Sequence, residues 1–164
     1  MPITPLHFGP SALISLPLNR YIDIPIFILA NVIVDIEPLM VMVFNLNYPL
    51  HGYAHTFLSG IIIGTIFGAL GYYAFKPINW GMKLIALDYT KNLRKAVISG
   101  VLGIWLHVLI DSFLYKDINP FFPVNENPFY HLINPEIIYK ACLISFLPVI
   151  IIYLIKVIRT NKRA

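Results

Sequence analysis

Apolar residues in this chain gather into long stretches that short polar segments separate. Four of the stretches approach or exceed the roughly 20 residues that an α-helix needs to cross the hydrocarbon core of a bilayer. They are Tyr21–Phe44, Tyr53–Phe75, Ala96–Tyr115 and Pro135–Val157. The pattern predicts an all-α integral membrane helical bundle with four spans.

A fifth apolar stretch, Phe8–Leu18, is too short to cross a bilayer alone. Gly9, Pro10 and Pro17 favour a broken element there. A short N-terminal half-helix, a re-entrant segment and an interfacial segment all fit. Irregular backbone at membrane depth survives only against protein or water. We therefore expect this segment to pack against the spans or to border a cavity.

The composition supports lipid as the solvent. Of 164 residues, 58% are hydrophobic and 12% are charged, and the mean hydropathy is +0.74. A soluble domain usually carries about a quarter charged residues. The length fits a single transmembrane domain over residues 1–164. The lone Cys142 excludes a disulfide framework and a cysteine-based zinc site within one chain.

The net charge of +4 does not indicate a nucleic-acid partner, because the basic residues lie between the apolar stretches. The positive-inside rule then places Arg20, the 76–95 loop and the C-terminus in the cytoplasm of a cell-membrane protein. The first residues lack the basic region of a signal peptide, so we expect His7 to be retained. The loop Lys116–Asn134, rich in aromatic residues and proline, is expected to form an external cap.

Ionisable residues interrupt the apolar spans. Asp35 and Glu37 lie in the first span, and His107 and Asp111 lie in the third. Each such group costs about 2.5–3.5 kcal/mol at the centre of a membrane helix on insertion scales. Several together indicate that they pair with one another or share a cation.

The spacing of these groups favours a cation. His51 and His55, at the mouth of the second span, are four residues apart, as are His107 and Asp111. Side chains at i and i+4 lie on the same face of a helix. Imidazole and carboxylate ligands suit zinc, with manganese or iron as alternatives, and the site could hold one ion or more.

Asp35 and Glu37 are two residues apart, so both can face one ion only if Pro38 distorts the turn. Otherwise Asp35 is the ligand, and Glu37 supports another ligand or acts as the catalytic general base. His7 joins the ligands if the Phe8–Leu18 segment begins inside the cavity. The expected metal ligands are His7, Asp35, His51, His55, His107 and Asp111.

Other features have simpler interpretations. Asp23 and Asp117, near the ends of spans, are expected to be solvated, and His131 to make an interfacial hydrogen bond. The glycines at 60, 64 and 68 favour close packing of helices within the chain rather than dimerisation.

At these residues the sequence resembles the YdjM-like family of predicted membrane-bound metal-dependent hydrolases. The resemblance rests on four motifs, at residues 4–10, 34–38, 51–56 and 107–112. Gly52 stands where that family often has an arginine. The resemblance implies a divalent metal and hydrolytic chemistry. A looser similarity to zinc-dependent phospholipases C and single-strand nucleases, in the His107/Asp111 pair, suggests phosphoester hydrolysis.

The expected function is therefore hydrolysis of a phosphoester or lipid-like substrate at the outer leaflet by a metal-activated water. A metal-ion or proton transporter using the same histidines and carboxylates is the alternative. A third interpretation is an assembly factor in which the metal only holds helices together. The sequence leaves the oligomeric state open.

Overall fold

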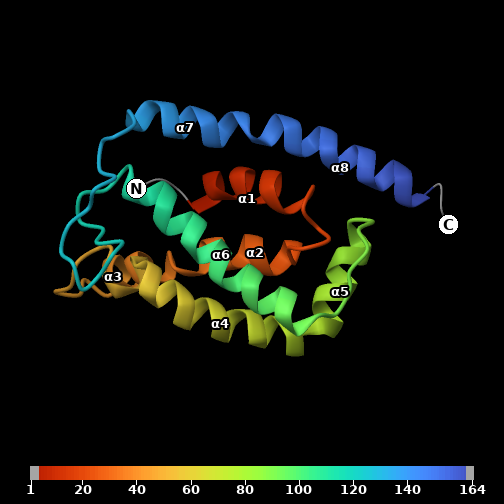
Figure 1. The fold of residues 1–164 in the computed structure, drawn as a ribbon, viewed down its shortest axis with the longest axis horizontal. Helices are drawn as coiled ribbons and strands as arrows, with labels where there is room; N and C mark the ends of the chain where they lie inside the picture. The colour runs from red at the N-terminus through yellow and green to blue at the C-terminus, as the bar shows by residue number, and fades with distance from the viewer. Residues whose placement is uncertain (1–3, 162–164) are drawn as a thin grey trace.

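The computed structural model describes residues 4–161, and 66% of the chain is helical, with no strand in the described part. Figure 1 shows one layered bundle of helices. In chain order these are η1 (Thr4–His7), α1 (Phe8–Ser15), α2 (Ile24–Ile33), α3 (Ile36–Val43), η2 (Tyr53–His55), α4 (Phe57–Tyr73), α5 (Phe75–Leu84), α6 (Leu93–Ser112), α7 (Pro135–Ile144) and α8 (Phe146–Asn161). The prediction of an all-α fold is confirmed.

Three candidate spans are long and apolar enough to cross a membrane: Ile24–Val43, Leu93–Ser112 and Pro135–Arg159. A fourth exists if α4 and α5, which are bent by 77° at their junction, count as one broken span. The predicted 76–95 loop is wrong in its first half, because α5 is a helix there. Its sequence is amphipathic, so the helix can lie across the end of the bundle instead of continuing α4.

Side-chain caps mark where several helices begin. The Asp23 carboxylate accepts a hydrogen bond from the Ile26 amide at the start of α2. Thr56 and Ser59 form a capping box at the start of α4. The Asn92 side chain accepts a hydrogen bond from the Lys95 amide at the start of α6. Asn and Asp at these positions satisfy amide groups that would otherwise lack partners.

The core lies where α6 packs between α2 and α4. Gly64 of α4 meets α6 so closely that a Cβ atom there would lie 2.6 Å from the Val101 backbone. Asn31 of α2, fully buried, donates a hydrogen bond to the Gly103 carbonyl of α6 at 3.1 Å. The prediction that the α4 glycines serve packing within the chain is confirmed, since all three are buried.

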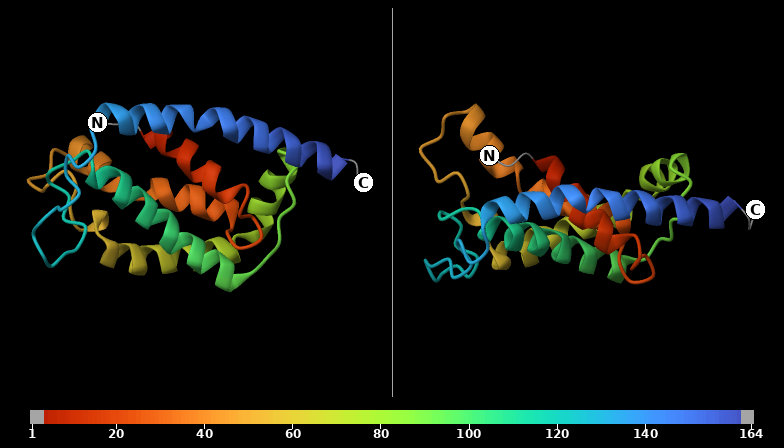
Figure 2. Two further views of the ribbon diagram at one scale, coloured as in Figure 1. Left: turned by 45° about the horizontal axis from the view of Figure 1, so that its top comes forward. Right: turned by 90° about the horizontal axis from the view of Figure 1, so that it is seen from above.

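The short helix α1 lies between α2 and the long α7–α8 pair (Figure 2). Gly9 faces the Cys142 carbonyl and the Ser145 side chain of α7 and its end. The predicted half-helix is therefore present, ends at Ser15 rather than Leu18, and packs against protein. The helix α1 starts near the end of the bundle that carries segments 44–56 and 113–134, called here the loop end (Figure 1). The opposite end, with α5 and the C-terminus, carries most of the basic residues and is called the basic end.

Candidate metal centre

A break in the first candidate span places Asp35 at the site. Pro38 lacks the amide hydrogen that would bond to the Val34 carbonyl, and its ring clashes with that turn. The helix accordingly stops at Ile33 and restarts at Ile36, with Asp35 between. Oδ1 of Asp35 lies 3.3 Å from Nε2 of His107 and 3.8 Å from Nε2 of His55.

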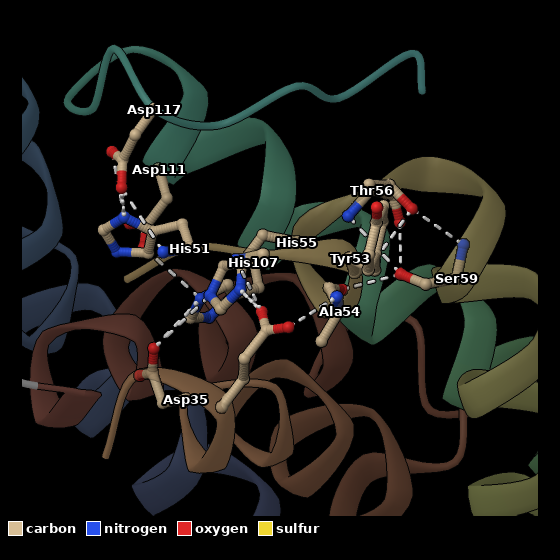
Figure 3. Close-up of polar contacts among 12 residues, drawn as sticks. Asp35, His51, Tyr53, Ala54, His55, Thr56, Ser59, His107, Asp111 and Asp117 are labelled. Atoms are coloured by element: carbon tan, nitrogen blue, oxygen red, sulfur yellow. Dashed lines mark hydrogen bonds and ion pairs between the residues drawn. The ribbon is translucent and has the colours of Figure 1, made fainter. Parts of the chain in front are cut away.

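Helix α6 contributes two residues from one face. His107 is fully buried and Asp111 nearly so, and their Nε2 and Oδ2 atoms are 3.3 Å apart. His55 comes from η2, directly before α4, and is also fully buried. These side chains reach one point from three segments that are far apart in the sequence (Figure 3).

Asp35, His55, His107 and Asp111 form what we call the four-ligand cluster. One ligand atom from each lies within 4.8 Å of the others. Two imidazole nitrogens and two carboxylate oxygens at such distances match the donor set of zinc, manganese or iron sites. The cluster could therefore hold a divalent ion.

The hydrogen bonding inside the cluster supports this fit. His55 Nε2, His107 Nε2 and Asp111 Oδ1 are buried and have no hydrogen-bond partner among the described residues. Each of them nevertheless has an ionisable neighbour at 3.2–3.8 Å. Asp35 Oδ1 lies near the two histidine nitrogens, and His7 Nε2 lies near Asp111 Oδ1. A buried polar atom without a partner costs about 1–3 kcal/mol. A cation shared by these atoms would remove that cost.

Glu37 orients His55 by bonding to the ring nitrogen that faces away from the cluster. Its Oε2 accepts from the His55 Nδ1 at 2.8 Å, which leaves the lone pair of Nε2 directed into the cluster. The same carboxylate accepts from the amides of Gly52 at 2.9 Å and Ala54 at 3.1 Å. Such a carboxylate–histidine pair is the usual support of a histidine ligand. The arrangement in which Asp35 faces the cluster and Glu37 supports a ligand is thus the one observed. The general-base role of Glu37 stays a prediction.

His7 joins two members of the cluster. Its Nδ1 lies 2.8 Å from Nδ1 of His107, and its Nε2 lies 3.2 Å from Oδ1 of Asp111. We assign the proton of the first pair to His107, because His107 Nε2 is then free to bind a metal. Neutral His7 then carries its own proton on Nε2, facing the Asp111 carboxylate. His7 lies beside the four-ligand cluster and is not one of its members.

His51 occupies the outer side of the cluster. Its Nδ1 lies 3.0 Å from the Asp117 carboxylate, and its ring packs against Tyr115 and against His55. Burial lowers the pKa of His51 and favours the neutral ring. Like His7, His51 lies beside the four-ligand cluster and is outside it. The roles of both as metal ligands stay predictions.

Of the two carboxylates expected to be solvated, Asp117 is exposed as predicted, whereas Asp23 is buried. Asp23 is 1% exposed and accepts a hydrogen bond from the Tyr89 hydroxyl at 3.0 Å. Burial, with Asp23 beside it, raises the pKa of Tyr89. The proline after Asp23, at the second position of α2, is a helix-start signal that could have revealed the cap. Asp117 nevertheless holds His51, and no local sequence signal links the two.

A cavity of about 380 Å³ opens beside the cluster at the loop end. We call it the loop cavity. His51 lines it and also packs against His55, so a single ring separates the cavity from the four-ligand cluster. Its lining residues are Tyr48, Pro49, His51, Gly52, Tyr53, Thr56, Asp117, Asn119, Phe122 and Asn125.

Comparison with models of known protein families, with curated proteins and with solved structures gives no match in any of the three. The resemblance to the YdjM-like hydrolases accordingly stays a prediction. The fold and the cluster define the class of protein: an all-helical chain with candidate membrane spans and a buried His/Asp cluster that could hold a metal ion.

Proposed function

We propose that this protein is a membrane-embedded hydrolase that uses a divalent metal ion, with a phosphoester or lipid-like molecule as substrate. One observation carries the proposal, namely that four ligand atoms from three separate segments lie within 4.8 Å of one another. The adjoining cavity supports it, since a substrate needs room beside the metal. The resemblance of the four sequence motifs to predicted metal-dependent hydrolases points the same way.

In this mechanism Asp35, His55, His107 and Asp111 would hold the ion, and zinc is the first candidate. A bound ion of this kind polarises a phosphoryl or acyl oxygen and lowers the pKa of its water toward 7. Glu37 and His7 keep the imidazole lone pairs directed at the ion. Asp35, with its side chain 17% exposed against 3% for Asp111, is the ligand carboxylate closest to solvent. Glu37 stays the predicted general base.

The membrane setting follows from the apolar helices. With four spans, counting the bent α4–α5 pair as one, the basic end faces the cytoplasm and the loop end faces outward. The four-ligand cluster then lies near the outer leaflet, where a lipid-like substrate can enter laterally. We infer the membrane orientation and a lipid-like substrate from the apolar helices, whichever metal is bound.

The test is elemental analysis of detergent-purified protein, followed by hydrolysis assays with phospholipids and isoprenoid phosphates in the presence of zinc or manganese. The His107→Ala, Asp111→Ala double variant should lose both metal and activity. Glu136→Gln, which alters a carboxylate 70% exposed on α7, should keep both. Wild-type protein that stays folded but takes up no divalent ion would refute the proposal.

A transporter for metal ions or protons is the second candidate. The break at Asp35 and the short α1 resemble the discontinuous helices of many transporters. In that case purified protein in liposomes would carry zinc or protons across the membrane and leave every phosphoester intact. Metal uptake without flux would instead favour the hydrolase.

A further inference from the structure

The loop cavity has an aromatic wall. Tyr48, Tyr53 and Phe122 all line it. The ring centroids of Tyr48 and Tyr53 are 6.3 Å apart, and those of Tyr53 and Phe122 are 5.0 Å apart. Three rings from two different loops thus gather around one hollow. Their grouping depends on contact between the two loops. Just after the first loop, the Phe57 amide at the start of α4 donates a hydrogen bond to the Pro120 carbonyl of the second loop at 2.9 Å.

The charge in the loop cavity is negative. Asp117 is the one carboxylate in the lining, and no lysine or arginine is present among the residues that line it. A second carboxylate, Glu37, lies directly behind the wall and accepts a hydrogen bond from the Tyr48 hydroxyl. Lys116 lines a neighbouring hollow that shares Asn119 and Asn125 with this one. A cavity with one sign of charge concentrates ligands of the opposite sign.

The aromatic wall is held in place before any ligand arrives. The Tyr48 hydroxyl accepts from the Tyr53 amide at 3.1 Å while it donates to Glu37 at 3.4 Å. The Tyr48 ring also covers Gly52 so closely that a Cβ atom at position 52 would collide with it. Glycine at that position therefore lets the ring lie against the backbone. A preformed wall of this kind lowers the entropic cost of binding.

From these features we propose that the loop cavity binds a cationic ammonium headgroup, so that the substrate is a phosphodiester lipid with a quaternary or primary amine. Aromatic rings attract such cations through their negative faces, and Asp117 supplies the opposite charge. An anionic headgroup would meet Asp117 with no lysine or arginine in the lining to balance it. This inference rests on the proposed hydrolase function for the position of the phosphate.

Such a substrate would present its two charges to the two parts of the site. The phosphodiester oxygens would bind at the four-ligand cluster, and the ammonium would lie on the far side of His51, in the loop cavity. A zwitterionic headgroup carries these charges a few bonds apart. The positively charged metal and the negatively charged cavity therefore recognise its two ends separately.

Binding of choline to metal-loaded protein in detergent, measured by ligand-observed NMR titration, tests the cavity without any phosphate. The matched probe is 3,3-dimethyl-1-butanol, which has the shape of choline and no charge. We expect choline to bind more tightly than the neutral probe by about two- to fivefold or more, as exposed cation–π contacts provide. Equal binding of the two probes, or no binding of choline, would overturn the inference.

Two variants locate the binding. Tyr53→Leu changes a ring that is 62% exposed, and Asp117→Asn removes the charge while keeping a hydrogen-bonding group beside His51. Both should reduce the preference for choline. Tyr73→Leu, at a ring 77% exposed at the far end of α4, is the control and should leave the preference intact. Wild-type preference in both Tyr53→Leu and Asp117→Asn would refute the assignment to this cavity.

A second measurement separates this inference from the proposed function. Hydrolysis of phosphatidylcholine and of phosphatidylglycerol is compared in mixed micelles with zinc. Faster cleavage of phosphatidylcholine, reduced in Tyr53→Leu, supports the inference. Equal cleavage of both lipids would leave the hydrolase standing and overturn the headgroup assignment. Choline binding without cleavage of any lipid would refute the hydrolase and retain the cationic site.

Discussion

Removing a bound metal should destabilise this protein measurably, because the four-ligand cluster buries polar atoms that a shared cation would satisfy. His55 Nε2 and His107 Nε2 have no hydrogen-bond partner within the described chain, and Asp111 Oδ1 has His7 Nε2 at 3.2 Å. A buried polar atom without a partner costs about 1–3 kcal/mol, so a cation shared by these atoms should stabilise the fold. Metal binding should therefore raise the free energy of unfolding.

The size of the measurable shift follows from mass action. An ion present at about 100 times its dissociation constant stabilises the folded state by about 2.7 kcal/mol. A domain of this size gains roughly 2–4 °C in Tm for each kcal/mol, so the expected shift is about 5–11 °C.

The assay is thermal unfolding in detergent, followed by the fluorescence of Trp80 and Trp105, with EDTA and with added zinc or manganese. Asp111→Asn keeps the shape of the side chain and removes a ligand charge, so its metal response should be lost or greatly reduced. Glu136→Gln makes the same chemical change at an exposed ion pair on α7 and should respond like the wild type. Equal Tm values with EDTA and with every metal tried, or an Asp111→Asn response equal to wild type, would refute the reasoning.

Three further predictions concern the residues around the cluster and the core. His7→Ala should weaken metal binding about 10- to 100-fold by freeing the ring of His107, as loss of an outer partner usually does; a competition titration with a metal indicator measures it, and an unchanged affinity would contradict the assigned contact. Glu37→Gln should weaken binding over the same range, about 10- to 100-fold, because His55 loses a charged acceptor; a metal affinity equal to wild type would show that His55 is held without it. Gly64→Ala should lower the free energy of unfolding by about 1–3 kcal/mol, since the new methyl group meets the Val101 backbone at 2.6 Å; Gly81→Ala, where a Cβ atom would meet nothing within 4 Å, is the control, and equal losses in chemical unfolding would argue against the packing account.

The sequence alone was sufficient for the fold class and for most of the cluster. Long apolar stretches can be satisfied only by helices in lipid, so the all-α prediction needed no tertiary information. The i,i+4 pair of His107 and Asp111 follows from helix geometry. The cost of ionisable groups in a span likewise singled out Asp35 before any contact was known.

Only the tertiary structure decided which candidates lie together. The two-residue spacing of Asp35 and Glu37 left two arrangements open, and the break at Val34–Asp35 selected one of them. His7 reaches Asp111 across more than half of the chain, and nothing in the local pattern encodes that distance.

The same limit explains the errors. A carboxylate at the end of a span has the same local sequence whether it faces water or a neighbouring segment. Asp23 is buried beside Tyr89, which lies in the segment before α6 and donates a hydrogen bond to it. Asp117 is exposed as predicted, but its contact with His51 needs two loops to meet at one end of the bundle. The charges of residues 76–95 are typical of a cytoplasmic loop, so the pattern predicts no helix there. The amphipathic helix α5 forms because its apolar face can pack at the end of the bundle. Local periodicity thus determines which segments are helical, whereas the contacts between distant segments determine which polar groups meet.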